Sequence, residues 1–164
     1  MKRSKLLAIP LALAITHSTP LIAHELKSKE GIKLSQAVPE KEKKHAKEMN
    51  FEGPQKTTGI KNVRLMGTVA LAGQFDDLEN RMLRAREIDI EPGGKVAVHQ
   101  HNKRPGVAYM VSGELIEHRK GKKPAVKKAG DTAFEWDGVV HWWENKSDKV
   151  ARIIVVDLVP KDIK

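Results

Sequence analysis

The sequence predicts an all-β sandwich or barrel that begins near residue 62. Beyond Lys61, short runs of β-branched and apolar residues alternate with turn-forming stretches. Strand signals that repeat at roughly 8 to 12 residue spacing are typical of such folds. The connections between the runs are too short for the helical crossovers that a parallel sheet needs, which argues against an α/β architecture.

Five runs are expected to contain the strands: VRLMGTVALAG (63–73), MLRAREIDI (82–90), VAYMVSGELIEH (107–118), DTAFEW (131–136) and KVARIIVVDLV (149–159). Turn residues separate them at EPGGK (91–95), NKRPG (102–106), KGKKP (120–124), WDG (136–138) and NKSDK (145–149). The stretch DDLENRML (76–83) is expected to form at least one helical turn.

The first 23 residues have the pattern of a secretory signal peptide. Basic residues at positions 2, 3 and 5 precede an apolar run from Leu6 to Ile15, and a more polar stretch ends at Ala23. The apolar run is too short to span a bilayer, and Pro10 interrupts it, which disfavours an anchoring helix. We expect cleavage near Ala23, a periplasmic or secreted protein, and no stable membrane insertion after processing.

Residues 24–61 are expected to form a poorly ordered linker or an N-terminal strap, and residues 62–164 the folded domain. The segment from 24 to 61 is rich in Lys, Glu, Ser and Gln and holds few large apolar residues. Such a composition buries too little surface to offset the entropy lost on ordering. Within it, AVPEKEKKHAKEM (37–49) favours a short exposed helix that begins near Pro39.

Charge and cysteine content narrow the class of protein further. The chain has no cysteine, so no disulfide framework stabilises it. Its formal net charge is +9, and most of the excess lies in residues 1–62. The densest basic cluster, RKGKKPAVKK (119–128), contains no aromatic residue that could stack on a base. We therefore expect no nucleic-acid partner.

Two histidines with one residue between them, His99 and His101, are the first candidate functional residues. Side chains at positions i and i+2 of a strand point to the same face, so the two rings would be directed at one spot. Neutral imidazole is the commonest metal ligand in proteins. The pair alone is weak evidence for a metal, because two histidines at a strand end are also common on partly exposed surfaces.

The wider spacing strengthens the metal interpretation, because histidines and glycines recur in two blocks. The first block holds Gly93, His99, His101 and Gly113, separated by five, one and eleven residues; the second holds Gly130, Gly138, His141 and Asn145, separated by seven, two and three. This pattern resembles the two motifs of the cupin superfamily across roughly residues 86 to 158. The resemblance implies a cupin-type jelly-roll barrel, also called a double-stranded β-helix.

The resemblance also implies a mononuclear metal site with His99, His101 and His141 as ligands. Two positions depart from the family pattern. Gly106 stands where the first motif usually has a glutamate ligand, and Trp136 stands where the second motif usually has a proline. The expected ligand set is therefore three imidazoles and no carboxylate; Glu114 and Glu117 are poor candidates to replace it.

A three-histidine cupin site is similar to that of dioxygenases that use ferrous iron. One divalent transition metal is expected, with iron favoured for an oxygenase and zinc, manganese or copper as alternatives. A metal shell without a carboxylate favours an anionic ligand. We expect a small anionic organic molecule as the substrate, with Arg86, Arg104, Tyr109, Trp136 and Trp143 as candidate binding residues. The tryptophans are equally well explained as barrel core.

The function favoured by these observations is that of an exported cupin, a small-molecule oxidoreductase of the dioxygenase type. A non-enzymatic module that binds a metal or a small ligand is the main alternative, and a zinc site that activates water is another. No catalytic acid or base can be assigned from the residues. The resemblance also suggests a homodimer that pairs through outer strands.

Overall fold

The computed structural model describes residues 38, 43–44, 46, 48 and 50–162. In these residues the chain forms eight strands: β1 (Thr58–Ala70), β2 (Arg81–Gln100), β3 (Gly106–Ser112), β4 (Glu114–Arg119), β5 (Ala125–Lys128), β6 (Thr132–Glu135), β7 (Val140–Glu144) and β8 (Ala151–Pro160). The predicted all-β fold is confirmed.

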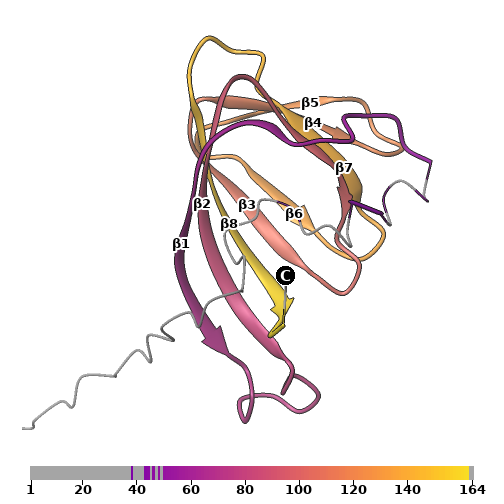
Figure 1. The fold of residues 1–164 in the computed structure, drawn as a ribbon, viewed down its shortest axis with the longest axis vertical. Coiled ribbons are helices and arrows are strands. Elements are labelled where there is room, and N and C mark those ends of the chain that lie inside the picture. Colours follow the sequence, from indigo (N-terminus) through magenta and orange to yellow (C-terminus); the bar gives the residue numbers. More distant parts are fainter. Residues whose placement is uncertain (1–37, 39–42, 45, 47, 49, 163–164) are drawn as a thin grey trace, which may run out of the picture.

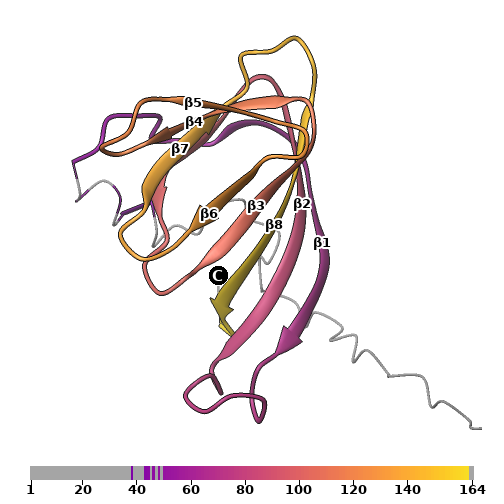
Figure 2. The ribbon, with the colours of Figure 1, turned by 180° about the vertical axis from the view of Figure 1, so that it is seen from behind.

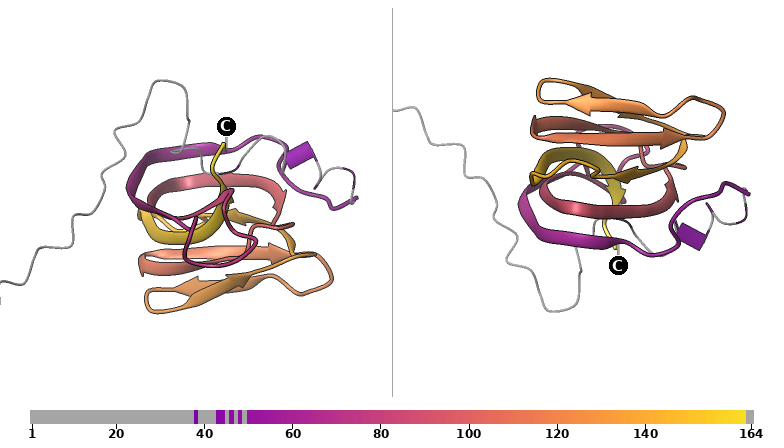
Figure 3. Two further views of the ribbon diagram at one scale, coloured as in Figure 1. Left: turned by 90° about the horizontal axis from the view of Figure 1, so that it is seen from below. Right: turned by 90° about the horizontal axis from the view of Figure 1, so that it is seen from above.

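The strands form one antiparallel sheet that folds over into a barrel. Their order is β5-β4-β7-β2-β8-β3-β6, and β1 pairs with β2 outside this path. Strands β4, β5 and β7 lie together in the upper part of Figure 1, and Figure 2 shows β6, β3, β8, β2 and β1 side by side. Seen along the long axis, β1 lies on the outer side of β2 (Figure 3). This is the jelly-roll architecture that the sequence predicted.

Strand β2 joins the two parts of the barrel. Its first half, 81–90, pairs with β1 and β8, and its end, 95–100, pairs with β7. The stretch EPGGK was expected to separate two strands, but it lies within β2. Gly93 adopts a φ of 76°, which a residue with a side chain rarely does, so the strand bends there instead of ending.

The expected helical turn at 76–83 is wrong. Turns and bends occupy most of the segment from Ala72 to Asn80, and β2 starts at Arg81. Residues 81–90 pair along their whole length with β8, and alternate side chains, Met82, Arg84 and Arg86, are buried. Pairing and burial in the tertiary structure override the weak local preference for a helix.

The N-terminal strap contacts the barrel through small and apolar side chains. Lys43, Lys44, Ala46 and Glu48 are helical, in line with the helix expected there, but that helix is not fully exposed. Ala46 is completely buried against Val98 and Val140, and Val38 joins the main core. The predicted signal peptide, residues 1–23, lies outside the described residues. Within the part that the structure describes, no helix is long and apolar enough to cross a membrane.

The barrel interior changes from apolar to polar along its length. Side chains from β2, β3, β6, β7 and β8 form the main apolar cluster, among them Ile88, Ala108, Ala133, Trp143 and Val155. Further along the same strands, the side chains that point inward are charged and buried: Arg84 and Arg86 on β2, Asp157 on β8 and Glu135 on β6. The alternation that builds the core thus also directs charged groups into the barrel.

At the polar end of the barrel, Asp157 binds three buried arginines. Arg84 donates two hydrogen bonds to its carboxylate at 3.0 and 2.7 Å, and Arg86 and Arg104 donate one each at 3.2 and 3.0 Å. All four residues are almost completely buried. Burial opposes ionisation of Asp157, but the guanidinium groups outweigh it and hold the pKa of Asp157 below its usual value.

We predict that Asp157→Asn lowers the free energy of unfolding by about 3–5 kcal/mol, because it leaves three buried guanidinium groups without their anion. Since the folded pKa of Asp157 is depressed, the wild-type stabilisation is fully present above about pH 4. It is lost as pH falls through the folded pKa. Urea unfolding at several pH values measures both effects.

Arg64→Gln is the matched control for this prediction. It removes the exposed ion pair of Arg64 with Glu87, whose contribution is below about 1 kcal/mol. Equal losses of stability in the two variants would contradict the assigned role of Asp157.

Candidate metal centre

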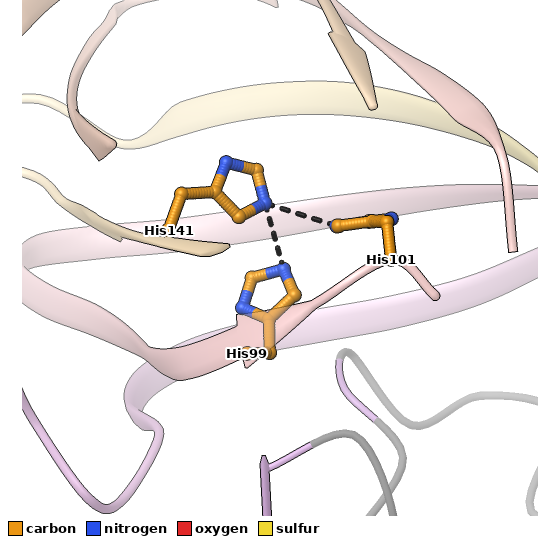
Figure 4. Close-up of side chains that lie close together, drawn as sticks. All are labelled: His99, His101 and His141. Atoms are coloured by element: carbon orange, nitrogen blue, oxygen red, sulfur yellow. Dashed lines mark hydrogen bonds between the residues drawn. The ribbon is translucent and has the colours of Figure 1, made fainter. Parts of the chain in front are cut away.

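Three histidines that are distant in sequence meet inside the barrel. His99 lies on β2, His101 directly follows it, and His141 lies on β7, where it is the register partner of His99. Their exposed fractions are 4%, 1% and 0%. Figure 4 shows the three rings turned toward a common point. The predicted cluster of His99, His101 and His141 is confirmed as a geometric unit.

Each ring is held by a hydrogen bond from its Nδ1 atom. His99 Nδ1 donates to the carbonyl oxygen of Ala97 at 2.8 Å, and His141 Nδ1 donates to Glu117 at 2.8 Å. His101 Nδ1 donates to the carbonyl oxygen of Arg104 at 3.3 Å. Carbonyl and carboxylate oxygens only accept hydrogen bonds, so all three protons lie on Nδ1.

The three Nε2 atoms consequently carry lone pairs that face one another. His141 Nε2 lies 3.0 Å from His101 Nε2 and 3.0 Å from His99 Nε2. Burial lowers the pKa of both His99 and His101 well below the usual range, and the neighbouring imidazole and the Arg104 guanidinium add to this effect. As neutral rings, His99 and His101 present Nε2 lone pairs toward His141, an arrangement that suits a bound cation.

The donor set fits a divalent transition metal. Two nitrogens bound at a right angle, each about 2.1 Å from one ion, are about 3.0 Å apart, as the Nε2 atoms are here. Neutral imidazole suits zinc, copper, iron and nickel, so the ligands alone do not choose among them. The cluster supports the predicted divalent metal site without fixing the metal.

Glu117 positions His141 and does not face the cluster. Its carboxylate binds the Nδ1 side of the ring, the side opposite Nε2, and also accepts a hydrogen bond from Arg119 at 2.9 Å. Burial opposes its ionisation, but His141 and Arg119 lower the pKa of Glu117. Such a partner fixes the tautomer and orientation of a ligand ring.

Glu135 is a site residue that the sequence reasoning missed. Its side chain is 4% exposed, its Oε2 lies 3.2 Å from His101 Nδ1, and its Oε1 lies 3.6 Å from His141 Nε2. Burial raises the pKa of Glu135. The alternation in TAFE, where Ala133 and Glu135 share the inward face, is the signal that could have identified it.

A small cavity of about 20 Å³ adjoins the cluster. Among its lining residues are His99, His101, Glu135, Arg86, Arg104 and Trp143. This volume admits about one water-sized group or ion. Three of the predicted substrate-binding residues, Arg86, Arg104 and Trp143, thus lie beside the candidate metal position.

The other two predicted substrate-binding residues lie elsewhere. Tyr109 is 45% exposed and does not line the cavity. Trp136 is 54% exposed, and the guanidinium carbon of Arg119 lies 5.3 Å from its ring centroid. Trp136 borders a separate outer hollow with Phe134 and several lysines. The cavity beside the histidines therefore does not include Tyr109 and Trp136.

The fold and the site define a class of protein: a small jelly-roll barrel with a buried three-histidine centre suited to one divalent metal. Residues 86–157 match the family model of the cupin domain. The chain accordingly contains a cupin domain over residues 86–157.

Several solved structures share the architecture. A predicted oxalate decarboxylase of Thermotoga maritima is 18% identical, with 63% of this chain and 98% of that chain covered and a TM-score of 0.43. An uncharacterised double-stranded β-helix protein of Klebsiella pneumoniae is 17% identical over 71% and 89% of the two chains, with a TM-score of 0.48. The cupin domain of a transcriptional regulator of the XRE family from Enterobacter cloacae is 13% identical over 63% and 100%, with a TM-score of 0.47. No curated protein matches the chain.

We predict that the protein purifies with about one equivalent of a transition metal and that His101→Ala combined with His141→Ala abolishes its binding, because one Nε2 cannot hold the ion. Elemental analysis of the purified protein measures the content. His118→Ala is the control, since His118 hydrogen-bonds Glu144 outside the cluster. Equal metal content in the double variant and the wild type would contradict the three-histidine site.

Proposed function

We propose that the protein is a metal-dependent oxidoreductase of the dioxygenase type that acts on a small organic anion. The observation that carries this proposal is the convergence of three imidazole lone pairs beside a cavity that two buried arginines line. A metal held there supplies open coordination positions for oxygen and substrate. The chain's own residues bind the anion, orient it and exclude water.

The arginines support an anionic substrate. Arg84, Arg86 and Arg104 all hydrogen-bond the carboxylate of Asp157, and Arg86 and Arg104 also line the cavity beside the histidines. Burial lowers the pKa of Arg86 to about 10, which leaves it charged at neutral pH. Arg104 Nε is buried and has no hydrogen-bond partner among the described residues. A carboxylate of the substrate would supply an acceptor for this donor.

The apolar walls limit the size of the substrate and its access to water. Trp143, Ile153 and Val155 line the cavity together with its polar groups. The small size of the cavity, about 20 Å³, favours an anion of few atoms over a large substrate. Excluding water strengthens the attraction between that anion and the arginines.

The small cavity also favours a second candidate function. A module that holds a metal and a small anion without turnover needs no more space than this. The two functions differ in one observable property: only the oxidoreductase consumes dioxygen when the metal and the anion are both bound.

We predict that protein loaded with ferrous iron consumes dioxygen with one or more carboxylates of one or two carbons, measured with an oxygen electrode. Arg104→Gln should raise the KM for that carboxylate by about 10- to 100-fold, the effect of losing a hydrogen bond to a charged group. Arg152→Gln is the control, because Arg152 binds Asp89 away from the cavity.

Two other outcomes are decisive. Carboxylate binding by calorimetry without oxygen consumption would favour the non-enzymatic module. Neither binding nor turnover with any carboxylate would contradict the assignment of an anionic substrate.

We propose further that the protein is exported and pairs with a second copy. The N-terminal pattern supports export. Three apolar residues of β1, Leu65, Met66 and Val69, are 37–49% exposed, and among the described strands β1 pairs with β2 alone. Native mass spectrometry of the exported fraction should show a chain that starts near His24 and a dimeric mass. An uncleaved chain or a monomer would contradict the respective proposal.

A further inference from the structure

We propose that the hollow on the outside of the barrel, bordered by Arg119, Phe134 and Trp136, is a second binding site, and that it takes a small organic anion with a planar ring and several acidic groups. The hollow shares no lining residue with the cavity beside the histidines. Its volume is about 510 Å³, within the range of small-molecule pockets. The inference does not rest on the metal centre.

The hollow lies where the sheet does not close on itself. Strands β5 and β6 stand at the two ends of the strand order. Figure 2 shows β5 in the upper part of the molecule and β6 below it. Side chains of β4 and β5 reach across: Lys127 Nζ donates to the carbonyl oxygen of Thr132 at 3.0 Å, and Arg119 donates to that of Phe134 at 3.0 Å. Cationic side chains therefore line the space between the two edges.

The hollow carries an excess of positive charge. Its basic lining residues are Arg119, Lys122, Lys123 and Lys127. Lys122 and Lys123 are exposed, and within the part of the chain that the structure describes neither ammonium group forms an ion pair. Glu117 is the one carboxylate among the lining residues, and it already binds His141 and Arg119. The charge of the hollow thus suits a ligand with more than one acidic group.

Two exposed aromatic rings border the same hollow. The alternation along β6 turns Ala133 and Glu135 inward and Phe134 outward, and Trp136 follows the strand. Phe134 is 62% exposed and Trp136 is 54% exposed, although large aromatic side chains are usually buried. The Arg119 guanidinium lies over the Trp136 ring. A planar ring can stack against such side chains while its acidic groups meet the lysines.

The fold brings together two features that are separate in the sequence. The basic cluster 119–128 contains no aromatic residue of its own, but β6 supplies Phe134 and Trp136 beside it. A protein that binds a single nucleic-acid strand places its charges and rings along an extended groove. Here they surround one hollow that is bounded by two four-residue strands, β5 and β6. These dimensions favour a small molecule over a polymer.

The test is a titration of the purified protein with benzene-1,3,5-tricarboxylate, followed by the NMR signals of the tryptophan indole N–H groups. Each of the two candidate sites has its own tryptophan, Trp136 at the outer hollow and Trp143 at the interior cavity. The probe should shift the Trp136 signal and leave the Trp143 signal in place. Raising the salt concentration should weaken binding, because the lysines are exposed to solvent.

Variants of exposed side chains identify the groups that bind. Lys122→Gln combined with Lys123→Gln should weaken binding by about 5- to 20-fold, the effect of losing two exposed charge contacts. Trp136→Ala should weaken it by about 5-fold through the lost ring contact. Arg119 stays unchanged, because it also binds Glu117, which holds His141.

Matched controls test charge and ring separately. Lys149→Gln and Phe75→Ala change an exposed lysine and an exposed aromatic ring that do not line the hollow, and both should bind the probe as the wild type does. Propane-1,2,3-tricarboxylate, which has the same number of carboxylates and no ring, should bind at least about 5-fold more weakly than the benzene compound. Circular dichroism verifies that each variant is folded.

The outcomes separate this inference from the proposed function. An unshifted Trp136 signal at about 10 mM probe, or a shift of Trp143 alone, would contradict the outer site. Equal binding of the two tricarboxylates would contradict the planar ring. Binding of heparin at the hollow without binding of the benzene compound would overturn the small ligand in favour of a polymer. Loss of metal or of oxygen consumption has no effect on these results, since the two sites share no residue.

Discussion

Three imidazole rings whose Nδ1 protons are all engaged leave three lone pairs directed at one point, and the rest of the centre depends on this constraint. The acceptors are two backbone carbonyl groups and one buried carboxylate, and these groups have no proton to donate to the rings. Protonating a ring at Nε2 would relieve the repulsion, but burial opposes an imidazolium ion at His99 and His101. A metal cation placed between the Nε2 atoms would satisfy these lone pairs, which is the physical basis for the proposed metal site.

Charge balance links this centre to the polar end of the barrel. Three guanidinium groups surround Asp157 within the same interior that receives the metal. A divalent ion adds further positive charge to a region of low dielectric constant, where like charges repel strongly. Glu135 offsets part of that charge, and a bound substrate anion offsets more. The proposed preference for an anionic substrate therefore rests on the buried charges as a whole, and not on the metal alone.

Repeated short apolar runs predicted the all-β architecture, and the resemblance to the cupin motifs implied the jelly-roll barrel and the histidine cluster. Alternating apolar residues identified the later strands, and the spacing of glycines and histidines identified the two motifs. The predictions that proved wrong concern segments whose structure depends on pairing with strands distant in sequence. The segment from 81 to 83 became strand through its contacts with β8. The stretch EPGGK became a bend inside β2 because β2 pairs with β8 before the bend and with β7 after it. The helical residues near Ala46 were expected to be exposed, but their burial depends on Val98 and Val140 on distant strands.

The sequence by itself determined the ligand types: a pair of histidines two residues apart, a third one downstream, and a glycine in place of the expected carboxylate. Each of these is a property of the order of residues along the chain. Only the tertiary structure decided that Glu135 lies beside Gly106, that Glu117 turns away from the cluster, and that three arginines share Asp157. These relations depend on the register between strands that are separated by many residues, and register is set by the packing of the whole barrel.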